Sequence, residues 1–159
     1  MPNALHLADT LAKTIGVSQM QRVGHLSELR QALALTEQGV KVLAIGRRFD
    51  DGLKLRHTDI DLFAQQGRVV AAVELKAYGR SDMHLLNGNA PRDMASIRVF
   101  CNSRRDPNRC VPIFAISERP GSQMDTWLQK KALENEVQLV YGAGAQFSEQ
   151  VSKIMRQIQ

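Results

Sequence analysis

Two predicted strands near the middle of the chain, 59–64 and 68–78, constrain the fold more than any other feature. They are joined by a tight, glycine-containing turn, which predicts an antiparallel hairpin. Side chains alternate between the two faces of a strand. Both faces of the second strand begin apolar, as in a strand covered on both sides, and Glu74 and Lys76 then follow together on one face. The hairpin is therefore expected inside a sheet with helices on both sides.

Apolar periodicity and turn residues predict the elements around this hairpin. Helices are expected at 3–14, about 19–38, from Pro91 onward, 122–136 and 147–158, and further strands at 40–45, 110–117 and 137–141. Polar loops are expected at 46–57 and 79–90. Leu26, Leu29 and Leu33 form the expected buried stripe of the second helix. Pro112 indicates that its strand lies at an edge or begins to pair late.

This order of elements predicts one α/β domain over residues 1–159, with a central mixed β-sheet flanked by helices. Within it we expect an N-terminal helix in 1–18, a core of helix, three strands, helix and strand in 19–117, and a helix-strand-helix unit in 118–159. The chain has no secretory signal and no apolar run long enough for a bilayer, so we expect a soluble protein that acts in the cytoplasm without a membrane partner. Cys101 and Cys110 are expected to be free thiols.

Positive charge is concentrated in two stretches, 41–57 and 92–109. The formal net charge is +5, and each stretch carries five basic side chains against two aspartates. Such a distribution favours a polyanionic partner, although a solvated loop face explains either stretch taken alone. The candidate nucleic-acid contacts are Arg47, Arg48, Arg56, His57, Arg104 and Arg105.

Pairing across the hairpin brings Asp59 and Asp61 within reach of Glu74, one of them directly opposite and the other diagonal. Close carboxylates repel, so one of them protonates unless a cation sits between them. Mg²⁺ prefers such oxygen ligands together with substrate phosphate and water. The alternative is a purely structural salt-bridge cluster, in which Lys76 neutralises Glu74.

The run from Asp61 through Glu74 to Lys76 resembles the active-site hairpin of the PD-(D/E)xK nucleases, and its spacing is similar to that of Holliday-junction resolvases. That family has a preceding helix with a glutamate, matched here by Gly24-His25-Leu26-Ser27-Glu28. Its order of elements matches residues 19–117, which implies a restriction-endonuclease-like sandwich. The family's leading proline is absent, because Ile60 precedes Asp61.

The resemblance implies a role for each matched residue. Asp61 and Glu74 would bind Mg²⁺ or Mn²⁺ with help from the Leu75 carbonyl, and Glu28 would reach the metal from the helix. Lys76 would orient or deprotonate the attacking water and stabilise the phosphorane charge. For Glu28 the alternative is a solvated helix residue. Asp59 would either support the metal ligands from behind or make structural hydrogen bonds.

The expected function is therefore metal-dependent hydrolysis of phosphodiester bonds in DNA or tRNA. The compact basic chain resembles the nuclease domains of contact-dependent growth inhibition toxins, which implies delivery into target cells and a cognate immunity protein. One alternative is a Holliday-junction resolvase or another repair endonuclease. The other is a non-catalytic nucleic-acid-binding module with the same fold. His84 and Tyr78 lie beside the hairpin, where they would contact phosphate or a base, or have only a structural role.

Overall fold

The computed structural model describes residues 19–50 and 57–159, except the side chains of 19–22, 47–50 and 57–59. The expected helix at 3–14 lies outside this part. Within the described part, three elements precede the hairpin's second strand, and helices and the remaining strands follow it. They are α2 (Gln19–Glu37), β1 (Lys41–Asp50), β2 (His57–Gln66), β3 (Val69–Lys76), the 3₁₀ helix η1 (Arg80–Leu85), α3 (Leu86–Ser103), β4 (Arg109–Ile116), α4 (Ser122–Asn135), β5 (Gln138–Tyr141) and α5 (Ala145–Ile158).

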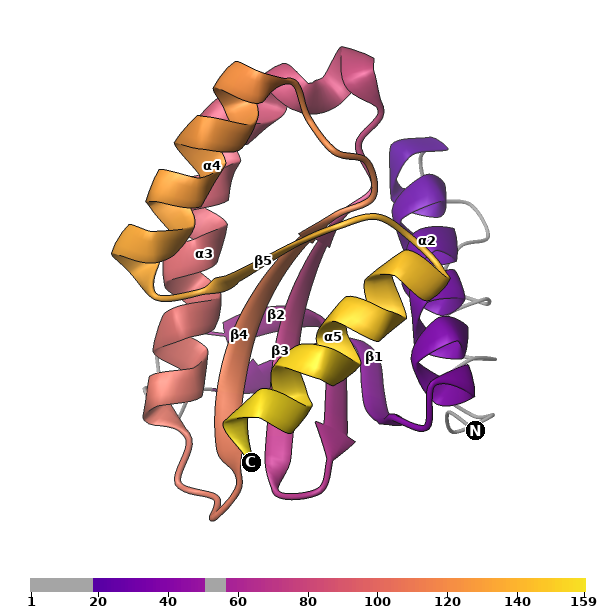
Figure 1. The fold of residues 1–159 in the computed structure, drawn as a ribbon, viewed down its shortest axis with the longest axis vertical. Coiled ribbons are helices and arrows are strands. Elements are labelled where there is room, and N and C mark those ends of the chain that lie inside the picture. The colour runs from indigo at the N-terminus through magenta and orange to yellow at the C-terminus, as the bar shows by residue number, and fades with distance from the viewer. Residues whose placement is uncertain (1–18, 51–56) are drawn as a thin grey trace.

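One mixed sheet organises these elements, with strand order β1-β2-β3-β4-β5. The first three strands pair antiparallel, and β3, β4 and β5 pair parallel. Helices α2 and α5 pack on one side of the sheet and α3 and α4 on the other (Figure 1). The expected α/β class, a mixed sheet flanked by helices, is confirmed. In the described residues no helix has the length and apolarity to cross a membrane.

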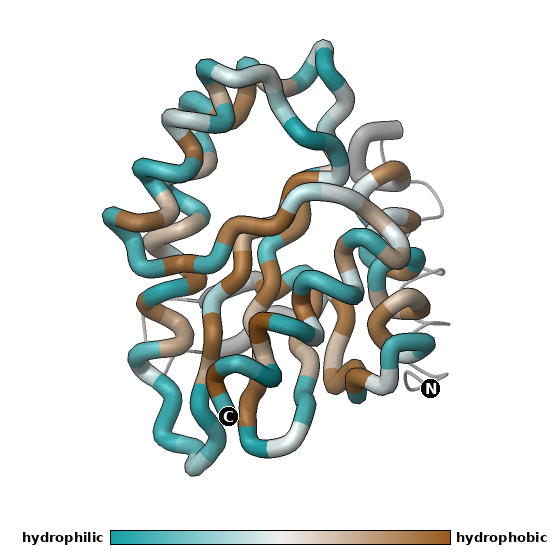
Figure 2. The backbone as a smooth tube through the Cα atoms, viewed as in Figure 1, coloured by the Kyte–Doolittle hydropathy of each residue, from teal (hydrophilic) through white to brown (hydrophobic). Residues whose placement is uncertain are grey.

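Strand β3 is covered on both faces, as its sequence predicts. Ala71 and Val73 belong to the core beneath α2 and α5, whereas Val70 and Ala72 belong to the core beneath α3 and α4. Apolar residues are accordingly concentrated along the central strands (Figure 2). Because burial of apolar surface is the main favourable term in folding, these two cores hold the carboxyl end of β3 in a fixed place. That end carries Lys76.

The described residues of the loop expected at 46–57, which are 46–50 and 57, are strand. β1 continues to Asp50 and β2 begins at His57, and the two pair antiparallel through Arg48 with Asp59 and Phe49 with Thr58. Backbone pairing with a neighbouring strand has overridden the polar, turn-like composition of this stretch. Residues 51–56 lie outside the described part.

Helix α3 begins at Leu86, ahead of the expected start at Pro91, which lies inside the helix. The first turns bury Leu86 and Ala90 against the core, and this packing offsets the hydrogen bond that proline cannot make. Pro112 lies in an interior strand, but β5 pairs with β4 only from Ile113 onward, so the late start is the reason that this proline is tolerated.

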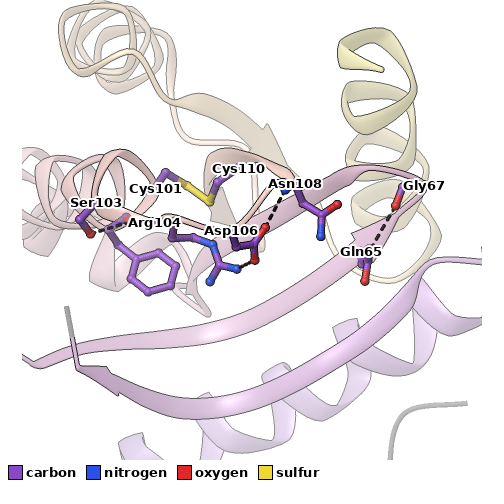
Figure 3. A network of polar contacts seen from close by, with 9 residues as sticks. Gln65, Gly67, Cys101, Ser103, Arg104, Asp106, Asn108 and Cys110 are labelled. Carbon is purple, nitrogen blue, oxygen red and sulfur yellow. Dashed lines mark hydrogen bonds and ion pairs between the residues drawn. A yellow bond between two sulfur atoms is a disulfide. The ribbon is translucent and has the colours of Figure 1, made fainter. Parts of the chain in front are cut away.

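Cys101 and Cys110 form a disulfide between the end of α3 and the start of β4, so the expectation of free thiols is wrong (Figure 3). The loop between them is held by Asp106, which pairs with Arg104 and accepts a hydrogen bond from the Asn108 N–H at 2.7 Å. The two cysteines are nine positions apart in sequence. This spacing matches no zinc-binding motif and does not by itself indicate a disulfide.

Replacing both cysteines by serine should lower the free energy of unfolding by about 2–3 kcal/mol, because the closed loop is short. For a chain of this size we expect a fall in Tm of roughly 5–10 °C. Thermal melts of wild type and of Cys101→Ser/Cys110→Ser measure it. Titration of the denatured, unreduced protein should detect no thiols, and two reactive thiols would contradict the disulfide.

Candidate active site

Strands β2 and β3 part where the predicted acidic residues lie. Their last paired residues are Leu62 and Val73, and the same register continued by one step would place Asp61 opposite Glu74. At this point a side chain replaces the backbone pairing between the strands. The Oδ2 of Asp61 accepts a hydrogen bond from the Leu75 N–H at 2.7 Å. The aspartate is thus fixed by the backbone of the strand that carries the glutamate.

Glu28 approaches the same point from α2. The expected leucine stripe of this helix is confirmed only at Leu29, since Leu26 and Leu33 are 37% and 45% exposed. The buried stripe also includes Glu28, Ala32 and Leu35. Glu28 is only 8% exposed, and its Oε2 has no hydrogen-bond partner. The solvated alternative for this glutamate is therefore excluded.

Gly46 in β1 makes room for that carboxylate. Its φ is +59°, and a Cβ added there would lie 3.2 Å from Glu28 Oε2. A side chain at this position would be strained by the positive φ and would crowd the carboxylate. The glycine was read from sequence as the start of a loop, but it is a close approach between a strand and the candidate site.

Burial disfavours ionisation of all three carboxyls, and repulsion from Asp61 adds to it at Glu28 and Glu74. Burial, followed by the charge of Asp61, raises the pKa of Glu28 from 4.5 to about 9. The same two causes raise the pKa of Glu74 to about 9, although Lys76 opposes them. Burial also raises the pKa of Asp61, against the lowering effect of the Leu75 N–H and Lys76. Without a further cation the cluster therefore holds protons at neutral pH.

Lys76 lies between two carboxylates. Its Nζ is 3.3 Å from Glu74 Oε1 and 2.7 Å from Asp93 Oδ2. Burial alone lowers the pKa of Lys76, but the charges of Glu74 and Asp93 more than offset it, so this pKa is raised. The lysine is charged and held beside the cluster.

Asp93 was missed by the sequence reasoning, which counted it only as one charge in a basic stretch. The signal was its position in α3, because Asp93 shares the buried stripe of Ala90, Met94 and Ile97. A carboxylate on such a stripe needs a partner within the fold. Here that partner is Lys76, which presents its ammonium from the sheet.

An open cavity of about 590 Å³ gives solvent access to these groups. Asp61, Glu74 and Lys76 line it, together with Val23 and Gly24 of α2. At Gly24 an added Cβ would enter open space, so this glycine leaves the cavity wide. The cavity lies where the amino-terminal half of α2 meets the end of β3.

Tyr78 also lines the cavity. Its ring centroid is 5.9 Å from Lys76 Nζ, and its hydroxyl accepts a hydrogen bond from Asn89 Nδ2 at 2.9 Å. The ring is therefore held in place beside the lysine. It can contact a ligand in the cavity without rearranging.

The donor set fits a divalent cation by its chemistry. Among the described residues no three His, Cys, Asp or Glu side chains are already arranged around a metal-sized space. The unpartnered Oε2 of Glu28 and the raised pKa values of Glu28 and Glu74 nevertheless leave a requirement for positive charge that Lys76 alone does not meet. Hard carboxylate oxygens of this kind are the ligands of Mg²⁺ and Mn²⁺.

The predicted nucleic-acid contacts are divided between two regions. Asp59, expected to support the metal ligands or to make structural hydrogen bonds, lies in β2 with its side chain outside the described part. Among the expected contacts, Arg47, Arg48 and His57 lie in β1 and β2 by their backbones, also with side chains outside the described part. Arg56 lies outside it entirely. Arg105 is exposed in the loop before β4. These positions remain predictions as contacts to nucleic acid.

Arg104 does not belong to a solvated face. Its guanidinium lies 4.7 Å from the ring centroid of Phe63 and 5.7 Å from that of Phe100. It also pairs with Asp106 (Figure 3). Burial lowers the pKa of this guanidinium. Arg104 is occupied by contacts that hold the disulfide-bridged loop against the sheet.

Comparison with known proteins gives a similarity of structure but none of sequence. No family model matches the chain, and no curated protein matches it significantly in sequence. The structure is similar to the crystal structure of an XisH family protein from Nostoc punctiforme, with 18% sequence identity and a TM-score of 0.49. The match covers 76% of this chain and 92% of that chain.

Because the pKa of Glu28 is raised, the effect of Glu28→Gln on thermal stability should depend on pH. The stability that wild type gains from neutral Glu28 is complete below pH 4.5 and is lost as the pH rises through about 9. Glutamine stays neutral throughout, so the Tm of the variant minus that of wild type should increase over this range in EDTA. A difference that is constant from pH 4.5 to pH 9 would contradict the burial of an ionising carboxyl at this position.

Proposed function

We propose that this chain is a metal-dependent nuclease that hydrolyses phosphodiester bonds. The observation that carries the proposal is the convergence of three carboxyls beside Lys76. Asp61 and Glu74 line one open cavity with Lys76, and Glu28 lies close enough to Asp61 and Glu74 for their charges to interact. The order of elements over residues 19–117, helix, three strands, helix and strand, adds support, because it is the order of the PD-(D/E)xK fold that the hairpin resembles.

Each group has a task in such a reaction. Asp61 and Glu74 would hold Mg²⁺ or Mn²⁺, with Glu28 beside them, and the bound ion would polarise the phosphate and activate water. Lys76 is charged, so its ammonium orients the attacking water and donates hydrogen bonds to the phosphate oxygens as negative charge develops there. Asp93 holds Lys76 in place from α3. Tyr78 packs beside the lysine at the cavity wall.

The purely structural alternative accounts for fewer of these observations. A salt-bridge cluster explains the contacts of Lys76 with Glu74 and Asp93. It leaves Glu28 without a cation. It also leaves Asp61, whose pKa is raised by burial despite Lys76, at the wall of an open cavity. Uncompensated buried carboxylates are costly, so a fold that needed only stability would not gather three of them.

The disulfide supports the toxin form of this proposal over a resident cytoplasmic repair enzyme. Disulfides persist in oxidising environments and are rare in cytosolic proteins. A nuclease delivered from one cell to another would pass through such an environment, and the Cys101–Cys110 bond would stabilise it there. Its substrate would be DNA or tRNA in the target cell, and its producer would need a cognate immunity protein.

Substitution of the cluster tests the proposal directly. Asp61→Ala, Glu74→Ala and Lys76→Ala should each reduce Mg²⁺-dependent cleavage by at least about a hundredfold, because each removes a group that acts on the same phosphoryl centre. Cleavage of plasmid DNA, single-stranded DNA and total tRNA, with Mg²⁺ or EDTA, is the measurement. Melting temperatures of the variants confirm that they remain folded.

The matched control is Glu37→Ala, an exposed glutamate at the far end of α2. It should cleave like wild type. Folded Asp61→Ala and Glu74→Ala variants that retain full activity would contradict the proposed site, as would wild-type cleavage that continues in EDTA.

A further inference from the structure

A second cavity lies beside the candidate active site, at the carboxyl ends of β4 and β5. Its volume is about 660 Å³. Its lining is polar and includes Arg80, Glu118, Arg119, Tyr141, Gln146 and Glu149. In sheets with parallel strands, ligands commonly bind outside the carboxyl ends of those strands.

The two cavities border the same piece of backbone. Ser117 lines the second cavity, and its N–H donates to the carbonyl oxygen of Lys76 at 3.0 Å. Arg80, at the start of η1, follows Lys76 closely in sequence. From the end of β3 to the end of β5 is two strand spacings, or roughly 10 Å. One strand of nucleic acid can therefore reach both cavities.

One wall of this cavity is a ready stacking surface. The Arg119 guanidinium lies 5.1 Å from the ring centroid of Tyr141, and the arginine side chain is 72% exposed. The tyrosine is fixed, because its hydroxyl donates to Asp125 Oδ1 at 2.8 Å and its carbonyl accepts from Gln150 Nε2 at 2.6 Å. Both guanidinium planes and aromatic rings are surfaces on which unstacked bases pack.

The remaining lining groups fit a nucleobase better than a bare phosphate. Arg80 and Arg119 supply the forked donors that suit phosphate. Glu118 and Glu149 would repel an isolated anion, but carboxylates accept hydrogen bonds from the amino groups of bases. Gln146 adds an amide, which can both donate to and accept from a base edge.

We propose that the second cavity binds one unstacked nucleotide of the substrate strand, a few nucleotides from the bond that is cut. The base stacks on the Arg119–Tyr141 pair, and Arg80 contacts the adjoining phosphate. This inference rests on the proposed nuclease function and narrows its substrate class. A base within a continuous duplex is not accessible to such a cavity, so the preferred substrate is single-stranded or looped nucleic acid.

Binding in EDTA tests this separately from cleavage. Wild type should bind a short single-stranded oligonucleotide of mixed sequence more tightly than the same sequence as a blunt duplex, measured by fluorescence anisotropy. Arg119→Ala should weaken single-strand binding about tenfold, in keeping with the loss of one stacked base. Arg156→Ala removes an exposed arginine from the last turn of α5 and should bind like wild type.

Arg119→Lys separates stacking from charge. Lysine keeps the positive charge, so the salt dependence of binding should stay as in wild type, while the affinity should fall nearly as far as in Arg119→Ala. Wild-type affinity in Arg119→Lys would overturn the stacked base, and equal weakening of duplex and single-strand binding by Arg119→Ala would overturn the substrate class.

The two proposals fail in different ways. Unaltered binding by Arg119→Ala would overturn the nucleotide cavity while leaving Mg²⁺-dependent cleavage in place. Absence of cleavage by wild type on any substrate, with single-strand binding lost in Arg119→Ala, would overturn the nuclease and retain the cavity. Melts of both Arg119 variants should match wild type, because the side chain is exposed.

Discussion

The burial of Glu28, Asp61 and Glu74 beside one another is the constraint on which the account of this site depends. Three carboxyls from a helix and two strands meet where β2 leaves β3, in surroundings that exclude most of the water that would screen them. Ionisation of the set requires positive charge, and Lys76 supplies only part of it. The fold holds this unfavourable group rigidly between two apolar cores. Such local cost is typical of functional sites, whose charges are arranged for a ligand rather than for the protein alone.

The order of the core elements and the hairpin could be predicted from sequence because their signals are local. Alternation across β3 and the spacing from Asp61 to Lys76 depend on neighbouring residues only. The strand at Lys41–Asp50 is longer than its sequence predicts. Its second half is polar, and only pairing with β2, a tertiary contact, makes that half a strand. The disulfide escaped prediction for a related reason, since the approach of Cys101 to Cys110 is set by how α3 turns back into the sheet.

The sequence predicts the site residues that lie in the strands, but it predicts those in the helices only in part. The helical periodicity of α2 does not determine whether Glu28 is buried. The helix has two stripes with apolar residues, and packing against α5 and the sheet determines which of them is buried. Asp93 and Gly46 were missed because the contacts through which they act, with Lys76 and Glu28, join elements far apart in sequence. An acidic residue within an apolar helical stripe, and a glycine within a strand, are the signals that would have identified them.

The most direct test of the central claim is calorimetric titration of the metal-free protein with Mn²⁺ at pH 7. The cluster holds protons in the absence of metal, so binding should be accompanied by proton release, detected as a dependence of the heat on the ionisation enthalpy of the buffer. Binding should disappear in Asp61→Ala. Absence of binding at millimolar Mn²⁺, or binding that is unchanged in Asp61→Ala, would contradict a metal centre at this site.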